Sequence, residues 1–262
     1  MIITLEKGDS AVRLDVPDDT IIDTLLGKDI PAMDVERAKA VIAQGIQESI
    51  PDNLPGKKIA VIVPDDTRLW ARGDLYVPVI TDTLLSLGAA PSAITIIIAL
   101  GTHADLGPEV FPSLVGQSCA DQIQVVNSAN TNTDRLVKIG TTGLGTELTV
   151  IKEGVEADHI IIFGGVLHHL IAGFGGGRKY ILPGIAGYDA IQQNHALAFL
   201  PDGRPHPGVI QGNLTGNPIH QDMEEAAQLF LKDKTCVYVA VAANGAGEIF
   251  AVTIDGTAFS DM

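Results

Sequence analysis

Side chains capable of acid–base chemistry stand directly after three short apolar runs of the sequence. The runs cover residues 58–64, 93–101 and 159–167, and the residues that end or follow them are Asp65, Asp66, Arg68, His103, His168 and His169. An imidazole accepts or donates a proton near neutral pH, and a neighbouring carboxylate can orient it. If the three runs are neighbouring strands, these groups meet at one place. The spacing therefore predicts a site for proton transfer.

Each of these residues also has a structural explanation when taken alone. Asp65 and Asp66 are typical caps of a following helix, and Arg68 can pair with either carboxylate at the surface. A single histidine such as His103 can equally be a hydrogen-bonded structural residue. His168 and His169 are adjacent, so at most one of them faces the site if the strand pleat continues. The convergence of several groups, rather than any one of them, favours a functional site.

A glycine-rich segment, Ala172–Lys179, carries the second set of candidate residues. Its members are Gly175, Gly176, Gly177, Arg178 and Lys179. Backbone N–H groups of such a loop can hold a phosphate, although the segment fits neither GxxxxGK[ST] nor GxGxxG. A lysine in a pocket poor in water can lose its proton and act as a nucleophile or form a covalent link. His195, on an expected helix, is a candidate metal ligand.

Elements that position these residues follow from the apolar pattern. Short apolar runs at 58–64, 93–101, 124–127, 159–167 and 235–242 predict buried strands, and helical spacing is found over 30–49, 76–87, 188–200 and 219–231. Strands that alternate with helices indicate a mainly parallel sheet, whose ligands bind beyond the carboxyl ends of the strands. We therefore expect an α/β fold with helices flanking the sheet, a short N-terminal β-hairpin at residues 3–16, and a long loop at 201–218. Residues 1–262 are expected to form a single domain.

Composition excludes several classes of function. The chain has 262 residues with 17 Lys and Arg against 32 Asp and Glu, a net charge of −15. Such acidity argues against nucleic acid and anionic membrane surfaces as partners. Two cysteines are too few for a disulfide framework or a cysteine zinc site. No signal peptide and no membrane-spanning run is recognisable, so we expect a cytoplasmic protein.

The motifs taken together resemble the nickel-dependent lactate racemase family. They are DxxR at Asp65 and Arg68, GTH ending at His103, HxxAGFxGGRK from His169 to Lys179, PGIA at 183–186, NH at Asn194 and His195, and GNPIHQDMEEAA at 216–227. They occur in the expected order and cover most of the chain. The HxxAGFxGGRK block followed by NH is the most specific part of the resemblance.

This resemblance implies an isomerase that racemises or epimerises a 2-hydroxy acid. Its cofactor would be a nickel-pincer nucleotide, a pyridinium-3,5-bisthiocarboxylic acid mononucleotide carrying nickel, linked covalently to Lys179. By the same resemblance His195 is the nickel ligand, and Gly175, Gly176, Gly177 and Arg178 lie against the cofactor. His103 and His169 form the acid/base pair for proton-coupled hydride transfer to the cofactor, and Asp65 and Arg68 orient imidazole and substrate. The expected partner is a small 2-hydroxy acid, and the sequence leaves homo-oligomers open.

Two departures from the family pattern stand out. Gly175 occupies a position where the family usually has serine, which removes a hydroxyl group from the cofactor loop. Family members also have two α/β domains, and the chain matches the first of them, so the second domain is expected to be absent. An isolated first domain can be inactive. A non-catalytic nucleotide- or metal-binding module, or an incomplete fragment of such an enzyme, is therefore the alternative to an active racemase.

Overall fold

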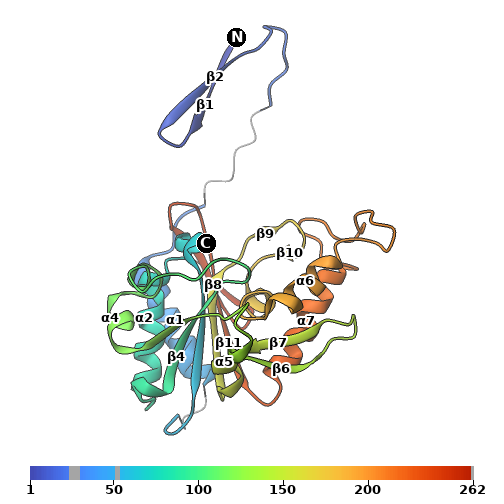
Figure 1. Cartoon of the computed structure of the whole chain (residues 1–262). Coiled ribbons are helices and arrows are strands. Elements are labelled where there is room, and N and C mark those ends of the chain that lie inside the picture. The colour runs from blue at the N-terminus through green and yellow to red at the C-terminus, as the bar shows by residue number, and fades with distance from the viewer. Residues whose placement is uncertain (24–29, 51–53, 261–262) are drawn as a thin grey trace. The chain divides into compact units, whose positions relative to one another are not determined.

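The computed structural model describes residues 1–23, 30–50 and 54–260 (Figure 1). The chain divides into two compact units, Met1–Ile30 and Pro31–Met262, and each is described by itself. In the first unit, strands β1 (Ile2–Lys7) and β2 (Ser10–Asp15) form an antiparallel hairpin. Ile3 pairs with Leu14 and Leu5 with Val12, so these four apolar side chains share one face of the hairpin. The expected N-terminal hairpin is present.

The second unit is built on a sheet of seven strands. Their order is β13-β12-β11-β8-β3-β4-β5. The bounds are β3 Ile59–Pro64, β4 Ile94–Ala99, β5 Gln124–Asn127, β8 His159–Gly165, β11 Thr235–Ala243, β12 Ile249–Ile254 and β13 Thr257–Ser260. Strands β5, β4, β3, β8 and β11 are mutually parallel, whereas β12 and β13 add antiparallel pairs at one edge. The mainly parallel α/β sheet predicted from the sequence is confirmed.

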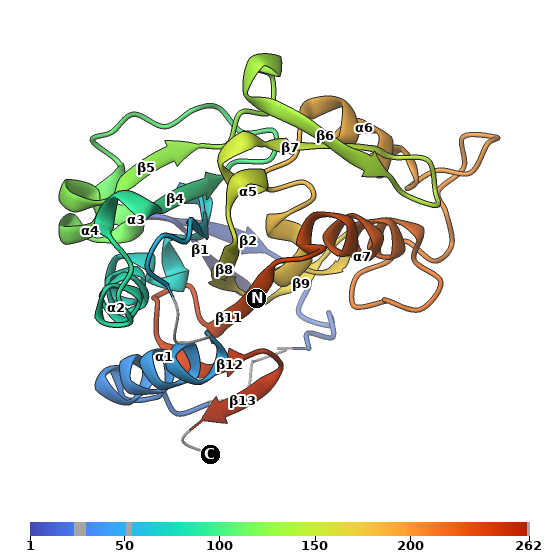
Figure 2. The ribbon, with the colours of Figure 1, turned by 90° about the horizontal axis from the view of Figure 1, so that it is seen from below.

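Helices cover both faces of this sheet (Figure 2). One face carries α1 (Val35–Ser49), α2 (Gly73–Ser86), α3 (Phe111–Val115) and α4 (Gln117–Gln122). The other carries α6 (Tyr188–Ala196) and α7 (Pro218–Leu231), the hairpin of β6 (Leu136–Thr141) and β7 (Glu147–Ile151), and α5 (Lys152–Glu156). Short 3₁₀ turns lie at Pro91–Ala93 and Thr133–Arg135.

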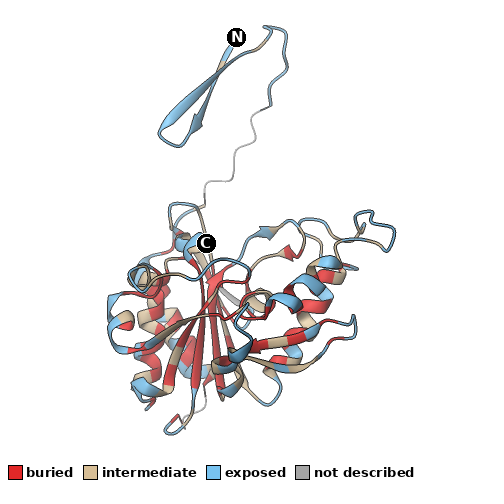
Figure 3. Cartoon of the chain, viewed as in Figure 1, coloured by how far each residue is buried: buried red, intermediate tan, exposed pale blue. Residues whose placement is uncertain are grey.

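Two apolar cores result from the alternation of side chains along the strands. Val61 and Ile161 face the α1–α2 side, and their neighbours Ile62 and Ile162 face the α6–α7 side. All four are buried, as are β3 and β8 throughout (Figure 3). Burial on both faces explains why these strands read as continuous apolar runs in the sequence.

Element boundaries differ from the sequence expectation at several points. The first helix starts at Val35, where the Asp34 carboxylate caps it by accepting from the Arg37 N–H, and α6 ends at Ala196 instead of continuing to residue 200. The β6–β7 hairpin and the edge strands β12 and β13 were missed. Strands β6, β7 and β12 are buried only in part. Residues 201–217 form the expected long loop, without a helix or strand.

Candidate active site

A pocket opens at the carboxyl ends of β3, β4 and β8, where the strand order reverses. The chain runs from β3 outward to β4 and β5, and β8 then pairs with the opposite side of β3. Parallel sheets bind ligands at such a switch point. The pocket has a volume of about 220 Å³. Of the residues singled out in the sequence, its lining includes Asp65, Arg68, His103, His169, Gly175, Gly176, Lys179 and His195.

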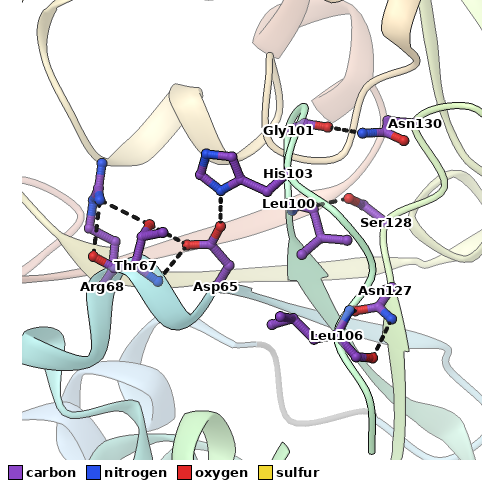
Figure 4. Close-up of polar contacts among 10 residues, drawn as sticks. All are labelled: Asp65, Thr67, Arg68, Leu100, Gly101, His103, Leu106, Asn127, Ser128 and Asn130. Atoms are coloured by element: carbon purple, nitrogen blue, oxygen red, sulfur yellow. Dashed lines mark hydrogen bonds and ion pairs between the residues drawn. The ribbon is translucent and has the colours of Figure 1, made fainter. Parts of the chain in front are cut away.

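Asp65 links the β3 end of the pocket to His103 (Figure 4). It begins the 3₁₀ helix Asp66–Ala71 as its N-cap, accepting from the Thr67 N–H at 3.2 Å and from the Thr67 hydroxyl at 2.6 Å. Its other carboxylate oxygen contacts Nδ1 of His103. The Asp65 side chain is only 5% exposed and that of His103 is 54% exposed. Asp65 therefore caps a helix and orients an imidazole at the same time.

Arg68 lies on the same turn as Asp65. Its Nη1 donates to the backbone carbonyl and to the hydroxyl of Thr67, each at 3.0 Å. Thr67 thus bridges the guanidinium and the Asp65 carboxylate (Figure 4). The remaining guanidinium N–H groups can bind an anion in the pocket.

The turn that carries His103 is held in place by the segment that follows β5. The Ser128 hydroxyl accepts from the Leu100 N–H at 3.1 Å, and the Asn130 amide donates to the Gly101 carbonyl (Figure 4). Gly101 has a φ of +58°, in the left-handed region that glycine tolerates best. These two polar contacts and the glycine hold the turn that positions His103 beside Asp65.

His169 reaches the pocket from a small hairpin after β8. Strands β9 (His168–His169) and β10 (Gly173–Phe174) pair antiparallel. Nδ1 of His169 accepts from the backbone N–H groups of Ile171 at 3.3 Å and Ala172 at 3.2 Å. Burial, and then the positive charge of Lys179, lower the pKa of His169 to about 4. His168 packs its ring against Phe174 and does not line the pocket.

The glycine segment brings Lys179 into the pocket. Gly176 has a φ of +90°, and a Cβ there would lie 3.0 Å from the Gly165 carbonyl oxygen, so the loop can approach β8 only without a side chain. Lys179 follows in the 3₁₀ helix Gly177–Tyr180. Burial lowers the pKa of Lys179 to about 8, with smaller contributions from Arg68 and Arg178. A useful fraction of this amine is therefore neutral and nucleophilic near neutral pH.

Gly177 and Arg178 are not among the residues that line the pocket. Arg178 turns away from it, donates to the Ala172 carbonyl at 3.2 Å and pairs with Glu224 at 3.0 Å. Its guanidinium therefore fixes the glycine segment to α7. Lys179 and Arg178 are neighbours in sequence, yet the 3₁₀ turn directs their side chains to different surroundings.

His195 lies in the last turn of α6, and one of its ring nitrogens is hydrogen-bonded to the helix backbone. Its Nδ1 lies 2.9 Å from the Ile191 carbonyl oxygen, so Nδ1 carries the proton and Nε2 keeps its lone pair. Burial lowers the pKa of His195, which favours this neutral, ligating form. Among residues 1–23, 30–50 and 54–260, no three His, Cys, Asp or Glu side chains come close enough to hold a metal ion.

A buried carboxylate that the sequence reading missed fixes the helix of His195. Asp222 of α7 is fully buried and accepts from Thr146 at 2.7 Å, from Asn194 at 2.8 Å and from Thr142. The sequence signal is an aspartate on the apolar face of an amphipathic helix, in register with Ile219 and Ala226. Such a position indicates a buried polar partner on a neighbouring element.

Comparison with known proteins assigns the chain to a family. The model of the lactate racemase N-terminal domain matches residues 7–205. The chain belongs to this family. Curated relatives within it include a lactate racemase of Thermoanaerobacterium thermosaccharolyticum, 29% identical over 231 residues, and one of Lactiplantibacillus plantarum, 34% identical over 174 residues.

Solved structures share the fold of this lactate racemase N-terminal domain. The apoprotein of the Thermoanaerobacterium thermosaccharolyticum lactate racemase has a TM-score of 0.76 at 28% identity, covering 97% of this chain and 58% of that one. A Thermotoga maritima protein has a TM-score of 0.64 at 19% identity, covering 85% of this chain and 55% of that one, and is alike in fold alone.

The chain spans about half the length of the curated relatives it matches, 53% of the first and 40% of the second. In the described part of the chain, no helix is both long and apolar enough to cross a lipid bilayer.

Proposed function

We propose that the chain is the cofactor-bearing domain of a racemase or epimerase that acts on 2-hydroxy acids. The observation that carries the proposal is one pocket lined by an aspartate-paired imidazole, a second imidazole, an arginine and a lysine with a pKa of about 8. Membership of the lactate racemase N-terminal domain family supports this reaction class. Lactate is the substrate in the names of the relatives, and a small 2-hydroxy acid is the substrate class proposed here.

The pocket residues fit a nickel-pincer nucleotide as the cofactor. Lys179 offers a partly neutral amine for a covalent link, and His195 offers an Nε2 lone pair for the metal. The lack of a three-ligand cluster in the described residues agrees with a metal that arrives already bound by its cofactor. Gly175 and Gly176 line the pocket without side chains, so a nucleotide can approach the loop backbone closely.

The chain's own residues would then bind the substrate and handle its hydroxyl proton. Arg68 holds the carboxylate of the 2-hydroxy acid through its free N–H groups. His103 accepts the hydroxyl proton at Nε2, and the Asp65 carboxylate at Nδ1 stabilises the resulting imidazolium. His169 is the second member of the acid/base pair. When bound, the cofactor supplies the acceptor and donor for the hydride at C2.

A binding module without turnover is the second candidate. The chain spans only about half of its curated relatives, and the part they have in addition can contribute groups to the substrate. In that case Lys179 and His195 capture the cofactor but the isolated chain does not convert a substrate. We also propose a cytoplasmic location for the protein, and homo-oligomers are compatible with the proposal.

Turnover of a single enantiomer separates these two candidates. The full chain, produced together with enzymes that make the nickel-pincer nucleotide, should convert either lactate enantiomer toward the racemate, as followed by chiral chromatography. Asp65→Asn should lower the rate by about 10²–10⁴-fold because His103 loses its charged partner. Asp66→Asn is the control, since Asp66 is exposed and does not line the pocket. A loaded chain without turnover, or equal rates in the two variants, would contradict the proposed reaction.

A further inference from the structure

Helix α7, which is described over its whole length, contributes no residue to the pocket lining, yet it holds two segments that do. Its N-cap Asn217 is buried and donates from its side-chain amide to the Ile171 carbonyl at 2.9 Å. Glu224, farther along the helix, pairs with Arg178 at 3.0 Å. Ile171 belongs to the turn between β9 and β10, and Arg178 to the glycine segment. Both segments are therefore attached to the same helix.

Arg178 joins three elements through separate atoms. Its Nη2 donates to the Ala172 carbonyl at 3.2 Å, and its Nε lies 3.0 Å from Oε1 of Glu224. Its backbone carbonyl accepts from the Ile181 N–H at 2.9 Å, within the turn that carries Lys179. The Arg178 side chain is only 11% exposed. A guanidinium suits this place because its N–H groups point in different directions from one rigid plane.

The contacts from Asn217 and Arg178 also hold the turn that orients His169. Nδ1 of His169 accepts from the N–H groups of Ile171 and Ala172. Asn217 holds the carbonyl of Ile171, and Arg178 holds the carbonyl of Ala172. The Ile171 carbonyl and the Ala172 N–H belong to one planar peptide unit, so a fixed carbonyl also fixes the donor. The direction of the imidazole therefore depends on both side chains.

His195 depends on the same helix by another route. Its neighbour Asn194 donates to Asp222 of α7 at 2.8 Å, at a buried point. Three candidate residues from three separate segments of the chain therefore share one support, which lies outside the pocket.

We propose that Arg178 and Asn217 are positioning residues, which attach the segments of Lys179 and His169 to α7 and so fix these two pocket groups relative to each other. Arg178 acts on both groups, and Asn217 acts on His169 alone. The use of the two groups in a reaction rests on the proposed function, but their placement does not. Each arm of the proposal can be tested on the full chain without cofactor.

Amine labelling as a function of pH tests the Arg178 arm. Arg178→Lys keeps the positive charge, but its single nitrogen cannot replace two donors that are separated in space. The glycine segment then loosens and water reaches Lys179, whose pKa burial lowers to about 8. The midpoint of Lys179 labelling should rise by at least about half a pH unit, which leaves about threefold less neutral amine at pH 7. In Arg178→Met the midpoint should rise further, because a neighbouring cation is lost as well.

Two variants on α7 separate position from charge. Glu224→Ala removes the anchor but leaves the guanidinium, so loosening of the segment raises the labelling midpoint of Lys179, whereas an unpaired Arg178 charge on a fixed segment would lower it. The Glu224 side chain is 47% exposed, so this variant should fold, as circular dichroism would confirm. Glu225→Ala is the matched control, since Glu225 accepts from the Gly143 N–H, and its curve should match the wild type. An unchanged or lower midpoint in Glu224→Ala, or an unchanged one in folded Arg178→Lys, would overturn the role of Arg178.

Titration of the His169 ring by NMR tests the Asn217 arm. In Asn217→Ser the hydroxyl can still cap α7, but it is too short to donate to the Ile171 carbonyl. Burial, and then the charge of Lys179, lower the pKa of His169 to about 4. Loosening of the turn should raise this pKa by about one unit, so that about a quarter of the rings are protonated at pH 5.5, against about 3% in the wild type.

The labelling curve of Lys179 should stay unchanged in Asn217→Ser, because Arg178 and Glu224 are both in place. A His169 pKa that stays near 4 in this variant would overturn the role of Asn217. Neither readout needs cofactor or turnover. A loaded wild-type chain without turnover would therefore contradict the proposed function and leave both tests of position intact.

Discussion

Lys179 owes its chemical character to its surroundings. An ordinary lysine amine is protonated at neutral pH, but this one is half-buried next to the cations Arg68 and Arg178. Both effects disfavour its charged form and bring the pKa of Lys179 to about 8. A fraction of this amine is therefore neutral and nucleophilic without any ligand bound.

Amine labelling as a function of pH tests this state. With a pKa of about 8, roughly one Lys179 amine in ten is neutral at pH 7, against about one in three thousand for a lysine of ordinary pKa. Reaction with an amine-directed reagent, read by peptide mass spectrometry, should therefore rise with a midpoint near pH 8. Lys58 is the control, because its hydrogen bond to Glu156 raises the pKa of that amine above its usual range. Identical labelling curves for the two lysines would contradict the account.

Most of the functional residues that line the pocket, but not every side-chain position, could be predicted from the sequence. Asp65, His103 and His169 follow buried strands, and the ends of parallel strands necessarily share an edge of the sheet. The sequence gives no comparable indication of the direction in which a side chain within a turn points. The resemblance places Arg178 against the cofactor, and the structure shows its guanidinium paired with Glu224 of α7, outside the pocket lining.

Among the elements, α6 depends on a polar contact inside the second core. Asp222 of α7 accepts hydrogen bonds from Asn194 of α6 and from Thr142 and Thr146 at the β6–β7 turn. Its carboxylate thus joins two helices and a hairpin at a fully buried point. Because His195 follows Asn194, the same contact fixes the position of the candidate metal ligand.

Removal of this carboxylate should destabilise the chain strongly. Asp222→Ala leaves the buried donors of Asn194, Thr142 and Thr146 without an acceptor, and we expect a loss of about 2–4 kcal/mol in the free energy of unfolding. Glu225→Gln is the control on the same helix: Glu225 accepts from the Gly143 N–H at an exposed site, and its loss should cost less than about 1 kcal/mol. The measurement is urea unfolding followed by circular dichroism. Similar losses of unfolding free energy in both variants would show that the buried carboxylate stabilises the chain no more than the exposed one.

The strands buried on both faces were predictable, whereas the β6–β7 hairpin and β12 were not. Strands such as β3 and β8 are apolar at every position, so their sequence indicates them directly. The β6–β7 hairpin and β12 contain exposed or half-buried positions between their buried ones. Their apolar runs are short, and tertiary pairing establishes them as strands.

The whole molecule combines an acidic chain with a cationic pocket. The net charge is −15, yet Arg68 and Lys179 both line the pocket, and Arg178 lies close enough to lower the pKa of Lys179. Acidic side chains elsewhere disfavour contact with a nucleic-acid backbone, and the two cations favour a small anion in the pocket. This separation of charge agrees with a carboxylate substrate and a nucleotide cofactor.

Capture of the cofactor at Lys179 is the central claim at this scale, and the mass of the intact protein tests it most directly. The full chain, produced together with a pathway that makes the nickel-pincer nucleotide, should gain one covalent adduct and one nickel ion per chain. The adduct should map to Lys179, disappear in Lys179→Ala, and persist in Lys138→Ala, whose amine pairs with Glu147 outside the pocket. An unmodified mass in the wild-type chain, or an adduct that survives in Lys179→Ala, would contradict the account.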